Sequence, residues 1–151
     1  KYQVAQEMKY KRPESILLIV YSSESQVLML RRKEPNDFWQ SVTGSLEWDE
    51  EPHATVRREL NEETGLTAYD SIVDCKHSNT FDIYDMWRNK YAPGTTQNQE
   101  HVFKLYIPTP EKIIIDDREH AEYQWMHRVE AAKIATSHTN RQAIFQWVPT
   151  S

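Results

Sequence analysis

The segment 52–64 carries the sequence signals of both ends of an α-helix, which fixes one element of the fold before any other is considered. Pro52 suits a first helical turn, and Gly65 suits the position just past a helix end. Val56 and Leu60 recur at helical spacing, so they form an apolar stripe that can be buried. The sequence therefore predicts a helix that is held against a core by one face.

Three glutamates beside that stripe break a local rule of helix energetics. Glu59, Glu62 and Glu63 follow the spacing i, i+3 and i+4, so they share one side of the helix. Like charges at these spacings repel by about 0.2–0.5 kcal/mol per pair, and a last helical turn prefers cations. A solvated acidic face is the ordinary interpretation of such a cluster. A bound Mg²⁺ or Mn²⁺ would instead turn the repulsion into coordination, because these hard cations prefer oxygen ligands.

The rest of the chain alternates short apolar runs with polar connections. Strands are predicted at residues 15–21, 27–32, 38–42, 71–75, 80–84, 101–107, 112–115 and 122–126, with a long loop at 85–99 and closing helices at 129–135 and 140–147. Many strands interleaved with few helices predict an α/β sandwich built on a mixed sheet. With no repeat or linker, residues 1–151 are expected to form a single domain.

Composition and charge exclude several classes of protein. The chain has 151 residues, a net charge of −5 and no basic excess, which argues against a general nucleic-acid binder. No apolar run approaches the roughly 18 residues of a membrane span. The single cysteine, Cys75, is expected to be a core thiol rather than a nucleophile. One cysteine and no secretory signal in the polar start of the chain predict a cytoplasmic protein.

The helix belongs to a longer pattern with fixed spacing. Its order is Gly44, five residues, Glu50, seven residues, Arg58-Glu59-Leu60, one residue, Glu62-Glu63, one residue, and Gly65-Leu66. A chance match to this pattern in one chain is on the order of 10⁻⁸ to 10⁻⁷ with typical residue frequencies. The pattern is a complete Nudix box, and the chain resembles the Nudix hydrolases.

The resemblance implies a loop, helix and loop clamped onto a mixed sheet in a Nudix-type α/β/α sandwich, with a divalent cation at the helix. Glu59 and Glu63 would be the principal metal ligands, and Glu62 a further ligand or the group that activates water. Arg58 and Glu50 resemble a supporting ion pair that orients this cluster. The chain departs from the usual pattern at two positions, with Asp49 where glycine often stands and Glu51 at the usual Ser or Thr helix cap.

Such a cluster suits hydrolysis of a phosphoanhydride. Negative oxygens protect the bond from attack, and a metal ion screens them and lowers the pKa of bound water. A carboxylate then accepts the proton, which typically contributes about 10²–10⁴-fold. The chain shows no HExxH spacing, P-loop or Gly-x-Ser-x-Gly elbow, so nucleophilic catalysis by serine or cysteine is unsupported.

Beyond the box, the chain resembles the bacterial dihydroneopterin triphosphate diphosphatases, a Nudix branch that serves folate synthesis. The resemblance covers most of residues 10–147, and its segments are 10–13, 27–30, 38–45, 91–94 and 140–144. It implies a small-molecule triphosphate substrate and release of pyrophosphate, whereas composition and charge already predict no nucleic-acid or membrane partner. The implied substrate contacts are Lys11, Arg32, Thr43, Asn61, Glu62, Glu63, Thr64 and Ser137.

Each implied contact has an ordinary alternative. Lys11 and Arg32 could be solvated charges, although a triphosphate needs fixed cations beside its metal. Thr43 could be a strand-end threonine with no ligand. Ser137 could cap the helix that includes Asn140.

Glu119 lies in the polar turn 116–120, where a solvated loop is the default interpretation. In the family, a glutamate at the matching position joins the metal site from outside the box, so Glu119 is predicted as a catalytic residue and ligand. Glu100 is the alternative for that role, and His120 is expected to be a neighbour rather than a ligand.

Three aromatic residues could stack on a pterin or purine ring. Trp39 is expected in the core, because aromatic residues in strands are more often core than ligand platforms. Tyr91 and Trp87 stay open as platforms.

Two alternatives to the pterin activity remain at this point. One is a broader (deoxy)nucleoside triphosphate pyrophosphohydrolase, because pterin and guanine share a hydrogen-bonding edge. The other is a non-catalytic Nudix-fold ligand sensor, which the presence of all three box glutamates disfavours.

Overall fold

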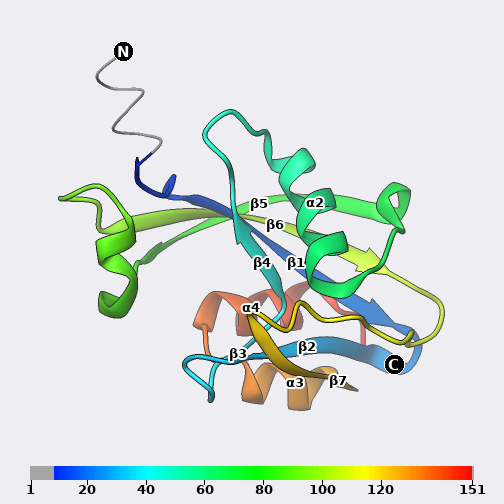
Figure 1. Ribbon diagram of the computed structural model, residues 1–151. Helices are drawn as coiled ribbons and strands as arrows, with labels where there is room; N and C mark the ends of the chain where they lie inside the picture. The colour runs from blue at the N-terminus through cyan, green and yellow to red at the C-terminus, as the bar shows by residue number, and fades with distance from the viewer. Residues whose placement is uncertain (1–8, 151) are drawn as a thin grey trace.

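The computed structural model describes residues 9–150, and Figure 1 shows how its elements are arranged. The strands are β1 (Glu14–Ser22), β2 (Gln26–Arg32), β3 (Trp39–Gln40), β4 (Val42–Ser45), β5 (Ile72–Asp82), β6 (Gln97–Tyr106) and β7 (His120–His127). The α-helices are α2 (Pro52–Thr64), α3 (Arg128–Ile134) and α4 (His138–Trp147), and 3₁₀ turns lie at η1 (Ser23–Ser25), η2 (Tyr69–Ser71) and η3 (Asp85–Lys90). No helix within residues 9–150 is long and apolar enough to span a membrane.

Strand β1 is the centre of a mixed seven-stranded sheet. It pairs parallel with β6 along its length, and antiparallel with β4 at one end and β2 at the other. All residues from Ile16 to Val20 are buried, which explains the continuous apolar run of this strand: both faces of the sheet are covered. Strand β6 in turn carries β5 on its far side, and β2 carries β3 and β7.

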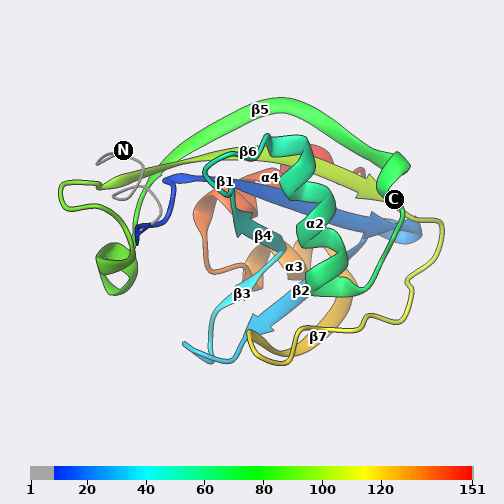
Figure 2. The ribbon, with the colours of Figure 1, turned by 45° about the horizontal axis from the view of Figure 1, so that its top comes forward.

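Alternate side chains of β1 point into two separate cores. Leu18 and Leu28 pack with Leu60 of α2 on one face, whereas Ile19 packs with Ile144 of α4 on the other. Figure 2 shows α2 on one side of the sheet and α3 and α4 on the opposite side. The predicted α/β/α sandwich with a mixed sheet is confirmed.

The predicted boundaries of α2 are confirmed, and the predicted segments 71–75 and 80–84 contribute to one strand, β5, with a register shift between Asp74 and His77. The predicted segment 38–42 is divided at Ser41 into β3 and β4. The predicted loop 85–99 is only partly irregular, because η3 opens it and β6 begins at Gln97.

The strand predicted at 112–115 is wrong. This segment pairs with no strand. The Ile114 N–H donates instead to the Thr64 carbonyl at the end of α2, with an N···O distance of 2.9 Å. Ile113 is buried in the core beside α2 and Ile115 packs against it, whereas Ile114 is 70% exposed. Ile113 and Ile115 therefore serve packing rather than a strand ladder.

Cys75 is half-buried rather than fully buried, and it packs against the core on the α4 side. Burial raises the pKa of its thiol to about 11. Because the thiolate is the nucleophilic form, the expectation that Cys75 is not a nucleophile agrees with its surroundings. The prediction that the chain begins without a secretory signal falls largely on residues 1–8, outside the described residues.

The start of α2 is held by Glu50 rather than by its cap residue. Glu51 occupies the cap position without a side-chain hydrogen bond. The Glu50 carboxylate instead accepts from the Thr55 hydroxyl at 2.7 Å, the Glu47 N–H at 3.0 Å and two guanidinium nitrogens of Arg58 at 2.8 and 2.9 Å. These contacts, led by that with Arg58, lower the pKa of Glu50 from 4.5 to about 2.

We predict that Glu50→Gln lowers the free energy of unfolding by about 2 kcal/mol at pH 7. The lowered pKa means that the ionised carboxylate is favoured in the folded state. Its stabilisation is complete above pH 4.5 and disappears as pH falls from 4.5 towards 2. Urea unfolding at pH 7, 5 and 3.5 measures the difference between the two proteins, which should shrink at the lowest pH. Glu51→Gln is the matched control and should change little. A difference that stays constant with pH would contradict the prediction.

Candidate active site

Glu59 and Glu63 lie one turn apart on α2, on the side that faces β4. The Glu59 carboxylate lies close to β4 at Gly44, where an added Cβ would be 1.9 Å from Glu59 Oε2. Any side chain at this position would displace the Glu59 carboxylate. The first glycine of the box is therefore required by this close approach.

The two carboxylates lie in surroundings that disfavour their charge. The side chain of Glu63 is only 3% exposed, and its Oε1 atom has no hydrogen-bond partner among the described residues. Burial, together with the neighbouring Glu59 carboxylate, raises the pKa of Glu63 well above its ordinary value. Burial also raises the pKa of Glu59 to about 7, and the charges of Glu62 and Glu119 add to that effect. Arg58 forms an ion pair with Glu59, but it is shared with Glu50 and Glu62, so it cannot balance two negative charges.

His120 does not supply that positive partner. Its Nε2 atom lies 3.9 Å from Glu63 Oε1 and 3.2 Å from Gln40 Nε2. Burial, with the nearby charge of Arg32, lowers the pKa of His120 to about 4, so the ring is neutral at pH 7. His120 is therefore a buried neighbour of the carboxylates, in agreement with the sequence-based expectation.

A divalent cation fits this acidic pair. Within residues 9–150 no three His, Cys, Asp or Glu side chains form a ready enclosure for a cation. Mg²⁺ seldom needs one, because it commonly binds through one or two carboxylates, waters and substrate phosphates. Glu59 and Glu63 provide two carboxylates, and the unpartnered Oε1 atom of Glu63 is available as a ligand. A cation would offset the desolvation of both groups.

Arg58 connects the loop before α2 to this pair. Its guanidinium holds Glu50 through two hydrogen bonds, and its Nη1 atom donates to Glu59 Oε2 at 3.1 Å. The same atom lies 3.4 Å from Glu62 Oε2. The predicted Arg58–Glu50 ion pair is present. The Nη1 atom of the same guanidinium fixes the position of Glu59.

The residues at the end of α2 separate into two environments. Glu62 is 53% exposed and lies with Asn61 and Glu119 at a shallow surface hollow outside the main pocket. Thr64 is buried, and its hydroxyl donates to the Leu60 carbonyl and accepts from the Leu66 N–H. Of the helix-end residues predicted to contact substrate, none lines the main pocket: Asn61, Glu62, Glu63 and Thr64. Glu119 is exposed and lines both the hollow and the pocket.

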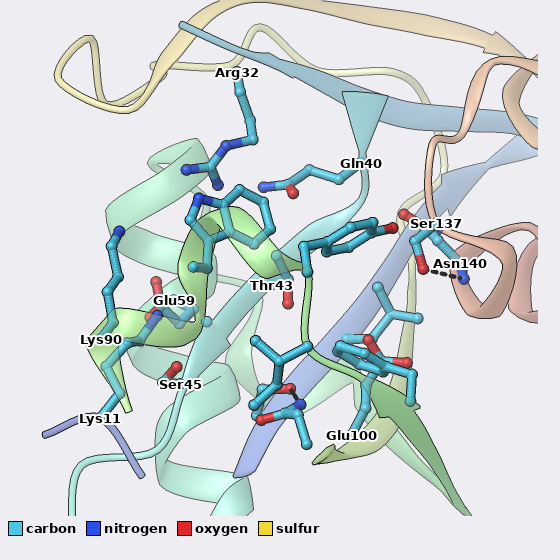
Figure 3. A pocket seen from close by; sticks show the side chains of 18 of the residues that line it. Lys11, Arg32, Gln40, Thr43, Ser45, Glu59, Lys90, Glu100, Ser137 and Asn140 are labelled. Carbon is cyan, nitrogen blue, oxygen red and sulfur yellow. Dashed lines mark hydrogen bonds between the residues drawn. The ribbon is translucent and has the colours of Figure 1, made fainter. Parts of the chain in front are cut away.

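A pocket of about 350 Å³ opens beside Glu59, and cations gather at that end of it. In Figure 3, Lys11, Lys90 and Arg32 lie on the same side of the pocket as Glu59. Although much of the Lys11 side chain is open to solvent, desolvation of its ammonium group, followed by the charges of Lys90 and Arg32, lowers its pKa. Three cations that repel one another in this way form a site for a multiply charged anion.

Lys90 was missed in the sequence, where residues 85–99 formed an undivided loop. The turn η3 ends at Lys90, and the Lys90 carbonyl accepts a hydrogen bond from the Lys11 N–H at 2.8 Å. A basic residue directly before the segment 91–94, which carries the family resemblance, was the available signal.

The opposite end of the pocket is polar but not cationic. Figure 3 shows Glu100, Ser137 and Asn140 there, away from the lysines. Ser137 lines the pocket and also caps α4, with the Asn140 N–H 3.5 Å from its hydroxyl oxygen. Thr43 lies between the two ends, and its hydroxyl donates to the Ile16 carbonyl at 2.8 Å.

Aromatic rings form part of the wall. Phe38, Tyr84 and Trp87 pack edge-on or tilted, with ring centroids 5.4–5.7 Å apart. The Arg32 guanidinium stacks 4.8 Å from the Trp87 ring, which positions its charge. Trp39 is in the core, as expected. Tyr91 lines the pocket but is buried.

Comparisons with known proteins agree with this arrangement. The family model of the NUDIX domain matches residues 11–148. A dihydroneopterin triphosphate diphosphatase of Escherichia coli (strain K12) is 41% identical over 143 residues, covering 92% of this chain and 94% of that protein. The protein of the same name from Haemophilus influenzae is 37% identical over 150 residues, covering 93% and 90%.

Solved structures show the same fold. The E. coli dihydroneopterin triphosphate pyrophosphohydrolase superposes with a TM-score of 0.87 at 40% identity, covering 92% of this chain and 97% of that one. An Ap4A hydrolase of C. elegans, solved as a binary complex, shares the fold alone. Its TM-score is 0.65 at 19% identity, covering 89% of this chain and 93% of that one. Nudix hydrolases generally need a divalent metal, which agrees with the buried carboxylate pair. With its complete box on α2 and matches along almost its whole length, this chain belongs to the Nudix hydrolase family.

Proposed function

We propose that this enzyme hydrolyses dihydroneopterin triphosphate to dihydroneopterin monophosphate and pyrophosphate, a step of folate synthesis. The observation that carries the proposal is the pocket with two unlike ends. Cations and acidic residues at one end suit a triphosphate, and uncharged polar groups with a buried carboxylate at the other suit a heterocycle. Relatives that bear this activity in their names span most of the chain.

The proposed cofactor is Mg²⁺, with Mn²⁺ as a substitute. Glu59 and Glu63 would hold it, and Glu62 and Glu119 would complete the acidic surroundings. When bound, the ion screens the phosphate charge and lowers the pKa of water. Arg58, held by Glu50, keeps the Glu59 carboxylate in place.

The remaining residues bind and orient the substrate. Lys11, Arg32 and Lys90 would pair with triphosphate oxygens, whereas Thr43 and Ser137 would face the substrate between the two ends. Glu62 or Glu63 would accept the proton that the attacking water loses. Asn61 and Thr64 would act by shaping the end of α2 rather than by direct contact, since Thr64 already uses its hydroxyl within the helix.

The proposal includes a single domain over residues 1–151 that acts in the cytoplasm on a small molecule, without a nucleic-acid or membrane partner. One sheet with a core on each face supports the single domain. The cytoplasmic location rests on the single cysteine and on the substrate.

We predict that purified protein with Mg²⁺ converts dihydroneopterin triphosphate to pyrophosphate, observed by ³¹P NMR. The kcat/KM for this substrate should exceed that for dATP, dGTP and oxidised dGTP. A preference above about tenfold for any deoxynucleotide would indicate a broader nucleotide pyrophosphohydrolase instead. Tight binding without hydrolysis would indicate a ligand sensor.

We predict that Glu63→Gln lowers kcat by at least about 100-fold with little loss of folding. Burial already disfavours the charged carboxylate, so a neutral side chain of the same shape fits. Thermal unfolding gives a second measurement: Mg²⁺ should raise the Tm of the wild type but not of the variant. Glu130→Gln, on the exposed face of α3, is the control and should behave as the wild type. Retained turnover together with a retained Mg²⁺ shift would refute the assignment.

We predict that Arg32→Ala raises KM by roughly tenfold or more, with a smaller change in kcat. Arg32 lines the cationic end of the pocket and stacks on Trp87. Arg31→Ala is a matched control, because the Arg31 side chain lies near Glu122 and donates to the Asn36 carbonyl. Steady-state kinetics on the triphosphate measure both variants, and equal effects would count against a phosphate role for Arg32.

A further inference from the structure

Strand β6 places two buried polar side chains, Asn98 and Glu100, whose hydrogen-bonding capacity is only partly used within the protein. Asn98 and Glu100 are two positions apart, so their side chains leave the same face of the strand. They are 3% and 5% exposed, and both line the pocket. Glu100 lies at the end of the pocket away from Lys11 and Lys90 (Figure 3). Groups buried in this way normally have partners, so these two suit a ligand.

The polar atoms left over are acceptors. Asn98 donates through Nδ2 to the Ser15 hydroxyl at 2.8 Å, and its Oδ1 atom has no partner among residues 9–150. Glu100 Oε1 accepts a long hydrogen bond of 3.4 Å from Asn79 Nδ2, and the nearby Thr139 side chain favours the charged form of the same carboxylate. A carboxylate has about four acceptor positions, so capacity remains.

Asn140, which also lines this end, has a protein partner for each of its two polar atoms. Its Oδ1 atom accepts from the Ser41 N–H at 2.8 Å, and its Nδ2 atom donates to the Ser41 hydroxyl at 3.0 Å. Both ends of that amide serve the fold. Among the described residues that line this end of the pocket, the buried atom without a partner is Asn98 Oδ1, and Glu100 has further acceptor positions. Together they call for a ligand edge with several N–H donors.

We propose that Glu100, with Asn98 beside it, selects the head group of the substrate by accepting hydrogen bonds from an amino group and the adjacent ring N–H. This inference rests on the proposed function and names the specificity residues of that site. The 2-amino-4-oxo-pyrimidine edge that pterin and guanine share presents both donors side by side. Adenine has an amino group next to a ring acceptor, which would face the carboxylate unfavourably.

The surroundings of Glu100 support this assignment. Burial raises the pKa of its carboxyl group, and no cation forms an ion pair with it among the described residues. Two N–H donors from a ligand would satisfy the ionised carboxylate through charge-assisted hydrogen bonds. A ligand that lacks one donor leaves a buried acceptor unpaired, which is a strong source of discrimination.

The test compares Glu100→Gln with the wild type on dihydroneopterin triphosphate, dGTP and dITP. The base of dITP differs from guanine only by the missing amino group. The wild type should prefer dGTP over dITP by about tenfold or more in kcat/KM, and the variant should prefer it by less than about threefold. The variant should also raise KM for the pterin substrate about tenfold or more while changing dITP little. Both kcat/KM values in the dGTP/dITP ratio are measured on the same protein sample. A loss of folded protein lowers both equally and leaves their ratio unchanged.

The control is Glu111→Gln, an exposed carboxylate away from the pocket, which should keep the wild-type ratio. Calorimetric Kd values for the two nucleotides give the same ratio without turnover. An unchanged ratio in Glu100→Gln, or a wild type with no preference for dGTP, would overturn the inference. If the wild type ignores the pterin substrate but discriminates between the nucleotides through Glu100, the proposed function fails and the inference stands.

Discussion

The close contact between α2 and β4 at Gly44 is the constraint on which the site depends. It leaves no room for a side chain beside Glu59, so the Glu59 carboxylate lies directly against the strand. Glu63, one turn further along the helix, is also buried, and burial raises the pKa of each carboxyl group. Glu59 shares its ion-pair partner, Arg58, with Glu50 and Glu62, so the charge of the desolvated pair is not balanced. A divalent cation would bind there, because the ion offsets a cost that the fold has already imposed.

The charge of the pocket wall changes from one end of the pocket to the other. The central strand β1 pairs directly with β4, β2 and β6, so it brings the Nudix box, the Arg32 strand and the Glu100 strand together. Cations from Lys11, Arg32 and Lys90 lie at the end near Glu59, and acceptors lie at the other end. A triphosphate joined to a donor-rich heterocycle matches both ends at once. Each end alone would suit many ligands. The two ends together restrict the ligands to molecules that carry both a polyphosphate and a donor-rich ring.

Local sequence signals predicted correctly the element whose two ends are marked by characteristic residues. Pro52 and Gly65 bracket α2, and the predicted helix agrees with the structure. The strand prediction at 112–115 failed because a short run of β-branched residues, here Ile113 to Ile115, looks like a strand whether or not a partner strand is present. Lys90 and Asn98 were missed because both fall in the segment 85–99 that was predicted to be a loop, and a single lysine or asparagine has no periodic pattern. Their importance comes only from which pocket they line.

The sequence by itself determined the reaction class, because hydrolysis of this kind needs carboxylates at fixed helical spacing, and that spacing is local. It also predicted the Arg58–Glu50 pair, which lies within the same motif. Only the tertiary structure decided which glutamates are buried together: Glu63 is nearly inaccessible, whereas Glu62, its neighbour in the chain, is half exposed. The tertiary structure also decided that Asn98 and Glu100 lie at the end of the pocket away from the proposed metal site. Burial and long-range pairing depend on how β1, β4 and β6 assemble, and no single segment encodes that assembly.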